Sequence, residues 1–172
     1  MLAVAVSDTR CVFARLVRDL TGDVYSHALI ADPPTDRIFE SQLFTGYGKW
    51  SRYTANPAER IRGYAPTLAT NAQQTAALAW CDETYRGTFY GFGQLVTLGA
   101  ALCLARIGIK DDAIVRDRLV CSELVYYWIE KLGARYRADV KRFHNDPDTF
   151  TPGLLHKYCE ASKLWTLRVS QL

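Results

Sequence analysis

Cys121 and His27 are the two side chains of this sequence whose chemistry and setting best suit attack on an acyl group. Cys121 opens residues 121–132, in which apolar residues recur at helical spacing. The first turn of a helix has unpaired backbone N–H groups and a positive dipole end, which stabilise a thiolate. His27 lies far earlier, within residues 25–31, which favour a strand. A cysteine with a histidine base is the arrangement of a thiol hydrolase.

Glu40 is the candidate third member of this group. It lies on the predicted strand that returns after a turn at residues 32–35. If the turn takes those residues, Ala31 pairs with Asp36. His27 then falls opposite Glu40 on the same face, where a carboxylate would orient the imidazole and stabilise its charged form. A turn one residue longer or shorter would put Glu40 on the other face, as a solvated residue.

Other residues compete for these roles. Cys11 is the rival nucleophile, because it lies in the first turn of another predicted helix. The rival bases are His144, which we expect in a surface turn, and His156, which we expect to be structural or exposed in the last helix. Cys121 shares its helix face with apolar residues, so an ordinary core cysteine is the alternative interpretation.

Composition favours a single globular domain over residues 1–172 in a reducing compartment. The apolar fraction of 49% is ordinary, and a net charge of +3 is too small to indicate nucleic acid. The five cysteines have neither metal-ligand nor disulfide spacing, and we expect Asp111 and Asp112 to be solvated, so no cofactor is expected. The longest apolar run, residues 95–105, is shorter than the roughly 20 residues of a membrane span. With no export signal recognised, we expect a cytoplasmic location.

The remaining pattern predicts an α+β fold, with a small antiparallel sheet packed against helices. Strands are expected over residues 2–6, 25–31, 37–42 and 164–169. Helices are expected from a cap at residue 8 or 9 to residue 20, over residues 71–85, 94–107 and 121–132, and from residue 151 onward. The second of these starts at Asn71 with Gln74 three positions later, a variant of the capping box. We expect loops and one or two short strands over residues 44–66, whose aromatic stretch 47–53 could line an acyl groove.

In their order, these motifs resemble the permuted NlpC-type papain-like cysteine hydrolases of the YiiX-like kind. The similar segments are Tyr25-Ser26-His27-Ala28, Phe39-Glu40-Ser41, Gly87-Thr88-Phe89-Tyr90-Gly91-Phe92, Val120-Cys121-Ser122-Glu123-Leu124-Val125 and Thr151-Pro152-Gly153-Leu154-Leu155. In the permuted group the histidine strand pair precedes the cysteine helix, as it does in this chain. The resemblance spans residues 23–155; residues 2–22 depart from it, since they lack the group's Gly-Asp strand opening.

The resemblance implies a papain-like fold with Cys121 as the nucleophile at a helix N-terminus, His27 as the base and Glu40 as the orienting residue. Tyr25 and Ser122 are candidates for the oxyanion site or the substrate lining. The implied activity is amide or related acyl-bond hydrolysis through an acyl-enzyme, on peptides, peptidoglycan fragments or acyl lipids. The alternatives are a thioesterase or acyltransferase, a silent peptide- or lipid-binding module and, more weakly, redox chemistry. The sequence specifies no oligomeric state.

Overall fold

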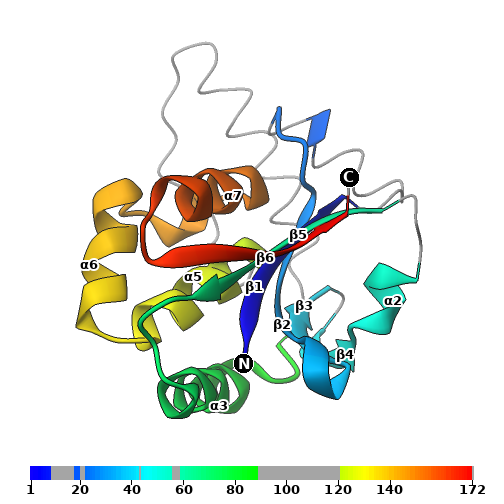
Figure 1. Cartoon of the computed structure of the whole chain (residues 1–172), viewed down its shortest axis with the longest axis horizontal. Coiled ribbons are helices and arrows are strands. Elements are labelled where there is room, and N and C mark those ends of the chain that lie inside the picture. The colour runs from blue at the N-terminus through cyan, green and yellow to red at the C-terminus, as the bar shows by residue number, and fades with distance from the viewer. Residues whose placement is uncertain (9–17, 20–21, 43, 56–58, 89–120, 172) are drawn as a thin grey trace.

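A single antiparallel sheet organises the part of the chain that the structure, a computed structural model, describes: residues 1–8, 18–19, 22–42, 44–55, 59–88 and 121–171. The strands are β1 Ala3–Asp8, β2 His27–Asp32, β3 Arg37–Ser41, β4 Thr45–Lys49, β5 Arg60–Pro66 and β6 Trp165–Gln171. Their order across the six-stranded sheet is β4-β3-β2-β1-β5-β6 (Figure 1). Two predicted helices, the one that ends at residue 20 and the one at 94–107, lie wholly or mostly outside the described residues, as do Cys11, Asp111 and Asp112.

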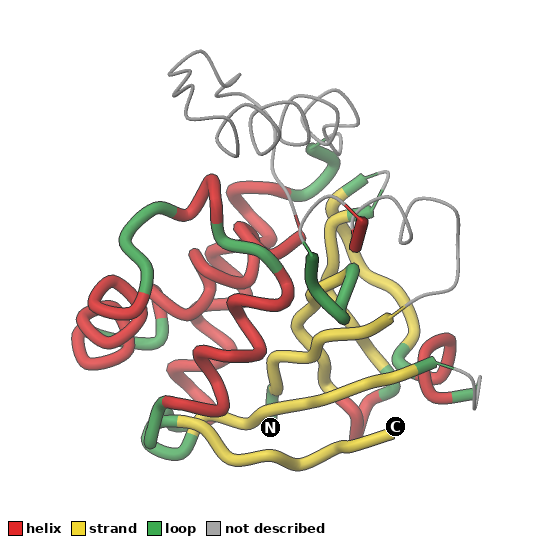
Figure 2. Tube along the Cα trace, turned by 90° about the horizontal axis from the view of Figure 1, so that it is seen from above, coloured by secondary structure: helices red, strands yellow, loops and turns green. Residues whose placement is uncertain are grey.

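Helices cover the two faces of this sheet unequally. The longer ones are α3 Asn71–Tyr85, α5 Cys121–Lys131, α6 Ala134–Phe143 and α7 Pro152–Ala161. They gather on one side of the sheet, over the larger apolar cluster, in which Val6 and Ile30 of the strands join Trp128 of α5 (Figure 2). No helix in the described part of the chain is long and apolar enough to cross a membrane.

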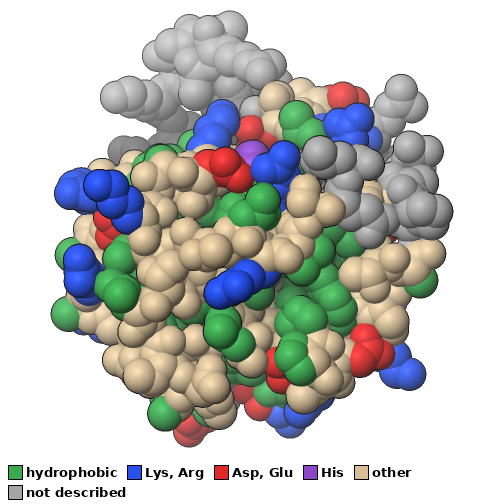
Figure 3. Space-filling model, viewed as in Figure 1, with side chains coloured by type: hydrophobic (Ala, Val, Ile, Leu, Met, Phe, Trp, Pro, Cys, Tyr) green, Lys and Arg blue, Asp and Glu red, His purple; other side chains and the backbone are tan. Residues whose placement is uncertain are grey.

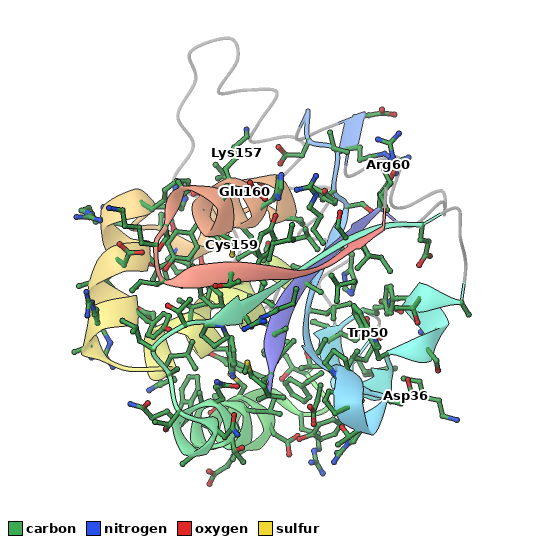
Figure 4. The ribbon with its side chains drawn as sticks, viewed as in Figure 1. Asp36, Trp50, Arg60, Lys157, Cys159 and Glu160 are labelled. Atoms are coloured by element: carbon green, nitrogen blue, oxygen red, sulfur yellow. The ribbon has the colours of Figure 1, made fainter. Side chains whose placement is uncertain are left out.

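The opposite face carries one short helix, α2 Ser51–Thr54, over a smaller apolar cluster that includes Leu29, Ile38 and Tyr53. The turn between β2 and β3 holds this helix in place. The Asp36 carboxylate accepts hydrogen bonds from the Ser51 backbone N–H at 2.6 Å and from its hydroxyl at 2.9 Å. Figure 4 shows Asp36 at this turn, below Trp50. The hairpin and α2 therefore form one connected unit.

The β2–β3 register differs from the predicted one by two residues. Pro33–Thr35 form a turn of 3-10 helix, and Asp36 closes it in the left-handed region with φ 51°. Asp32 therefore stays in β2 and pairs with Arg37, which places Leu29 opposite Glu40. The predicted pairing of Ala31 with Asp36 is wrong. A shift of two residues preserves the face, however, so His27 and Glu40 still lie on the same side as diagonal neighbours.

Prediction of the other elements succeeded where periodicity was strong. The helix predicted over residues 71–85 is α3, but its capping box is formed by Thr70 and Gln73. Gln74 is buried instead, and its side chain accepts a hydrogen bond from the Leu2 backbone N–H at 2.8 Å. The predicted helix at 121–132 is α5, which ends one residue earlier. Helices α2 and α6 were not predicted.

Candidate active site

Cys121 is the first described residue of α5 and is 1% exposed. The predicted apolar face of this helix is fully buried, with Leu124 and Trp128 both at 0% exposure, and α5 packs along β2. This packing brings the first turn of α5 to the beginning of β2. Backbone N–H groups in a first helical turn lack intrahelical partners, so they favour a negative charge on a side chain there.

His27, the first residue of β2, contacts both Cys121 and Glu40. Its Nε2 lies 2.8 Å from Glu40 Oε2, and its ring also makes a side-chain hydrogen bond to Cys121. Because a carboxylate can only accept, Nε2 carries the proton. Nδ1 is then the ring nitrogen left for the sulfur. The three predicted residues are therefore brought together in the order sulfur, imidazole, carboxylate.

Glu40 is held in its ionised form by its hydrogen-bond donors. Only 6% of the residue is exposed. Burial alone would raise the pKa of its carboxyl, but the hydrogen bond and charge of His27, followed by the Tyr53 hydroxyl, outweigh burial and lower the pKa below its usual range. The guanidinium of Arg52 approaches the other oxygen, Oε1, at 3.9 Å and acts in the same direction. The carboxylate therefore presents a full negative charge to the imidazole.

Burial and the two neighbours Cys121 and Glu40 act in opposite directions on the protonation of His27. Burial is the largest influence and favours the neutral ring. The charge and hydrogen bond of Cys121, and then those of Glu40, favour the charged ring, and together they raise the pKa of His27 to about 10. The raising contribution of Cys121 is that of a thiolate beside an imidazolium. The geometry therefore favours an ion pair between the sulfur and the ring near neutral pH.

The two candidate lining residues occupy different settings. Ser122 is the second residue of α5 and is 1% exposed. Tyr25 lies in the core, and its ring meets the edge of the His156 ring at a centroid distance of 4.8 Å. Its hydroxyl makes a side-chain hydrogen bond with Arg62, so it is engaged beside β5.

The other described cysteines are buried as protonated thiols, and the other described histidines are hydrogen-bonded outside the candidate site. Burial raises the pKa of Cys81 to about 12 and that of Cys159 well above its ordinary value, which keeps both thiols protonated. His144 caps the C-terminus of α6, and its Nε2 contacts the Thr149 hydroxyl at 2.9 Å. His156 lies on α7 and contacts the Tyr64 hydroxyl at 2.7 Å through Nδ1.

The surroundings of His156 are ionic. In Figure 4, Lys157 lies on the outer side of α7, whereas Cys159 points toward the sheet. Figure 3 shows acidic and basic side chains interspersed over this part of the viewed face. Glu160 accepts hydrogen bonds from Tyr64 at 2.6 Å and from Arg62 at 3.2 Å. The polar group around His156 is thus internally paired.

Sequence reasoning missed three residues beside the candidate site. The Tyr53 hydroxyl donates to Glu40 Oε2, and Gln42 donates to the Tyr53 oxygen at 2.7 Å. Arg52 in turn donates to Gln42 at 3.3 Å. The aromatic stretch 47–53 was expected in a loop or an acyl groove, but Tyr53 is 1% exposed and belongs to the core. No periodic or motif signal marks these residues.

Comparison with known proteins shows a similarity at the level of the fold. No family model matches the sequence, and no curated protein matches it significantly. The structure is similar to the crystal structure of yiiX from Escherichia coli O157:H7, described as a metalloprotein of the group DUF1105. The TM-score is 0.60 at 14% sequence identity, over 98% of this chain and 95% of that one.

The metal in that description has no evident counterpart among the described residues of this chain. Within them, no group of three or more His, Cys, Asp and Glu side chains is arranged to hold a metal ion. At 14% identity the similarity concerns the fold. The chain therefore has a YiiX-like α+β fold, with Cys121, His27 and Glu40 gathered at one end of its sheet.

Proposed function

We propose that this chain is a thiol-dependent hydrolase that cleaves an amide or related acyl bond. The observation that supports this most strongly is the chain of contacts from Cys121 through His27 to Glu40. The three residues come from α5, β2 and β3, and each is less than 9% exposed. A nucleophile, its base and an orienting carboxylate in hydrogen-bonding order are the requirements of covalent acyl transfer.

The first half-reaction would form a thioester. In the ion pair His27 Nδ1 already holds the proton of the Cys121 thiol, and the thiolate attacks the carbonyl carbon of the substrate. The oxyanion of the tetrahedral intermediate would lie at the start of α5, where backbone N–H groups stabilise negative charge. When the carbon–nitrogen bond breaks, Nδ1 returns its proton to the leaving amine. Glu40 stabilises the imidazolium throughout and keeps its own charge.

The second half-reaction would release the acid. Water attacks the thioester carbonyl while His27 Nδ1 accepts its proton. The carbon–sulfur bond then breaks, and Cys121 leaves as the thiolate beside the imidazolium. The ion pair favoured by the raised pKa of His27 is therefore both the start and the end of the cycle.

For the substrate we favour a peptide, including the peptides of peptidoglycan. The alternative is an acyl lipid or thioester on the same machinery. Both begin with the same attack of the sulfur on a carbonyl, so one labelling experiment tests the reaction and separates the substrates. The protein is incubated with p-nitrophenyl esters of an N-acetylated dipeptide and of a medium-chain fatty acid, and the acylated peptides are identified by mass.

The expected result is one acyl group on Cys121, with faster labelling by the dipeptidyl ester. Cys81 and Cys159 serve as controls within the same molecule, because their raised pKa values predict no labelling. The Cys121→Ser variant should lose the adduct. If Cys121 stays unlabelled, or is labelled no faster than the two buried cysteines, the chain is a binding module and the proposal is wrong.

A further inference from the structure

Tyr53 contacts both the carboxylate and the imidazole of the candidate site from the face opposite α5. Its hydroxyl donates to Glu40 Oε2, the same oxygen that accepts from His27 Nε2. Its ring stacks on the His27 ring at a centroid distance of 6.0 Å and an interplanar angle of 12°. One side chain therefore touches two of the three residues to which we assign the chemistry.

The hydrogen bonds around Tyr53 all run in one direction. Burial, and then the charge of Glu40, raise the pKa of the Tyr53 phenol above its usual value, so the phenol keeps its proton and donates it to the carboxylate. Its oxygen accepts from Gln42, whose own oxygen accepts from Arg52. The series of hydrogen bonds ends on the Glu40 carboxylate, and each bond in it polarises and strengthens the next.

The Glu40 carboxylate also has a competing partner. Arg52 is 64% exposed in its side chain and lies 3.9 Å from Oε1, on the solvent side. Gly48 of β4 leaves room beside that oxygen, because a Cβ at this position would stand 3.2 Å from Oε1. Without the phenol, Oε2 would lose the donor that the described residues of α2 supply, and the carboxylate could turn toward Arg52.

We propose that Tyr53 is a positioning residue for the reaction, acting through Glu40. The inference rests on the proposed function. The phenol fixes Oε2 toward His27 Nε2, which holds the proton on that nitrogen and leaves Nδ1 for Cys121. The ring stack restricts rotation of the imidazole. The β2–β3 turn anchors α2 through Asp36, so the phenol and the two residues it positions move as one unit.

The test measures the pH dependence of Cys121 alkylation by iodoacetamide, followed by mass, in Tyr53→Phe. This variant keeps the ring and removes only the hydroxyl. We expect the rate at pH 6 to fall by roughly 10- to 100-fold, and the profile to move to higher pH, because a bond donated to a charged acceptor is lost. The matched control is Tyr136→Phe, which removes a buried hydroxyl bonded to the Leu68 and Ala69 backbone N–H groups; its profile should not move.

A double-mutant cycle separates positioning from general stability. If Tyr53 acts through Glu40, adding Tyr53→Phe to Glu40→Ala should cause no further loss of reactivity. An equal loss in both backgrounds, or a shift no larger than that of Tyr136→Phe, overturns the inference. Should Tyr53→Phe not fold, Gln42→Leu removes the donor to the phenol, and the absence of any shift in that variant would overturn it as well.

The outcome for wild-type protein distinguishes the two proposals. If wild-type Cys121 reacts like a free thiol at every pH, the proposed function fails. If wild-type Cys121 reacts at low pH but Tyr53→Phe does so equally well, the hydrolase proposal stands and only the role of Tyr53 is refuted.

Discussion

Replacing Glu40 by Gln should weaken acylation of Cys121 without abolishing it. The substitution preserves size and removes the negative charge that His27 Nε2 contacts at 2.8 Å. Both partners are almost completely buried, with side-chain exposures of 8% for Glu40 and 10% for His27, so little solvent screening reduces the effect. A hydrogen bond to a charged group contributes about 1.5–3 kcal/mol, which corresponds to a rate loss of roughly 10- to 150-fold.

The same change should lower the pKa of His27. About 1.5–3 kcal/mol converts to a decrease of roughly one to two pKa units, since one unit is about 1.4 kcal/mol. The assay is the rate of Cys121 acylation by the activated ester that labels wild type, combined with an NMR titration of the His27 ring. Activity should fall less than in Cys121→Ser, because an orienting group contributes less than the nucleophile.

The matched control is Glu160→Gln on α7. This carboxylate also accepts hydrogen bonds, but its donors are Tyr64 and Arg62 of β5 rather than residues of the candidate site. Its substitution should leave acylation unchanged. An unaltered rate and titration in Glu40→Gln, or an equal loss in Glu160→Gln, would refute the orienting role of Glu40.

Three further predictions concern the same region. The lowered pKa of Glu40 contributes stability that is present above its ordinary pKa and is lost as the pH falls through the lowered value. The difference in free energy of unfolding between wild type and Glu40→Gln, measured with urea, should therefore become smaller from pH 7 to pH 3. Gly153→Ala should destabilise the fold by about 1–3 kcal/mol in the same assay, because the added Cβ would clash with the Asp23 carboxyl group; unchanged stability would contradict this contact. Cys121→Ser should lower the pKa of His27 in an NMR titration, because Cys121 is the strongest raising influence on that ring; an unchanged titration would show that the sulfur does not act on it.

The sequence predicted correctly that His27 and Glu40 share a face, although the predicted pairing of His27 directly opposite Glu40 is wrong, because Leu29 stands there. Side chains alternate between faces with a period of two residues, so only the parity of the register mattered. The predicted register was off by two residues because the two prolines form a 3-10 turn that ends at Asp36. Helix α5 was predicted because its apolar face repeats at helical spacing and is buried throughout.

The Tyr53 network could not be predicted in the same way. Helix α2 has four residues, too few for any periodicity to appear. The Tyr53 hydroxyl reaches Glu40 only because the β2–β3 turn anchors α2 through Asp36. That contact depends on tertiary placement rather than on local pattern. Helix α6 is a different case: it was missed although its buried residues Tyr136 and Val140 stand four positions apart, a helical spacing that the sequence does show.

The most direct test of the central claim is the alkylation rate of wild-type Cys121 from pH 4 to pH 10, compared with His27→Ala. A thiolate paired with an imidazolium should react well below the midpoint of a free thiol, which is about pH 8.5. We expect wild type to show this low-pH reactivity and His27→Ala to return to the profile of a free thiol. A wild-type profile centred near that of a free thiol, or one that His27→Ala leaves unchanged, would contradict the account.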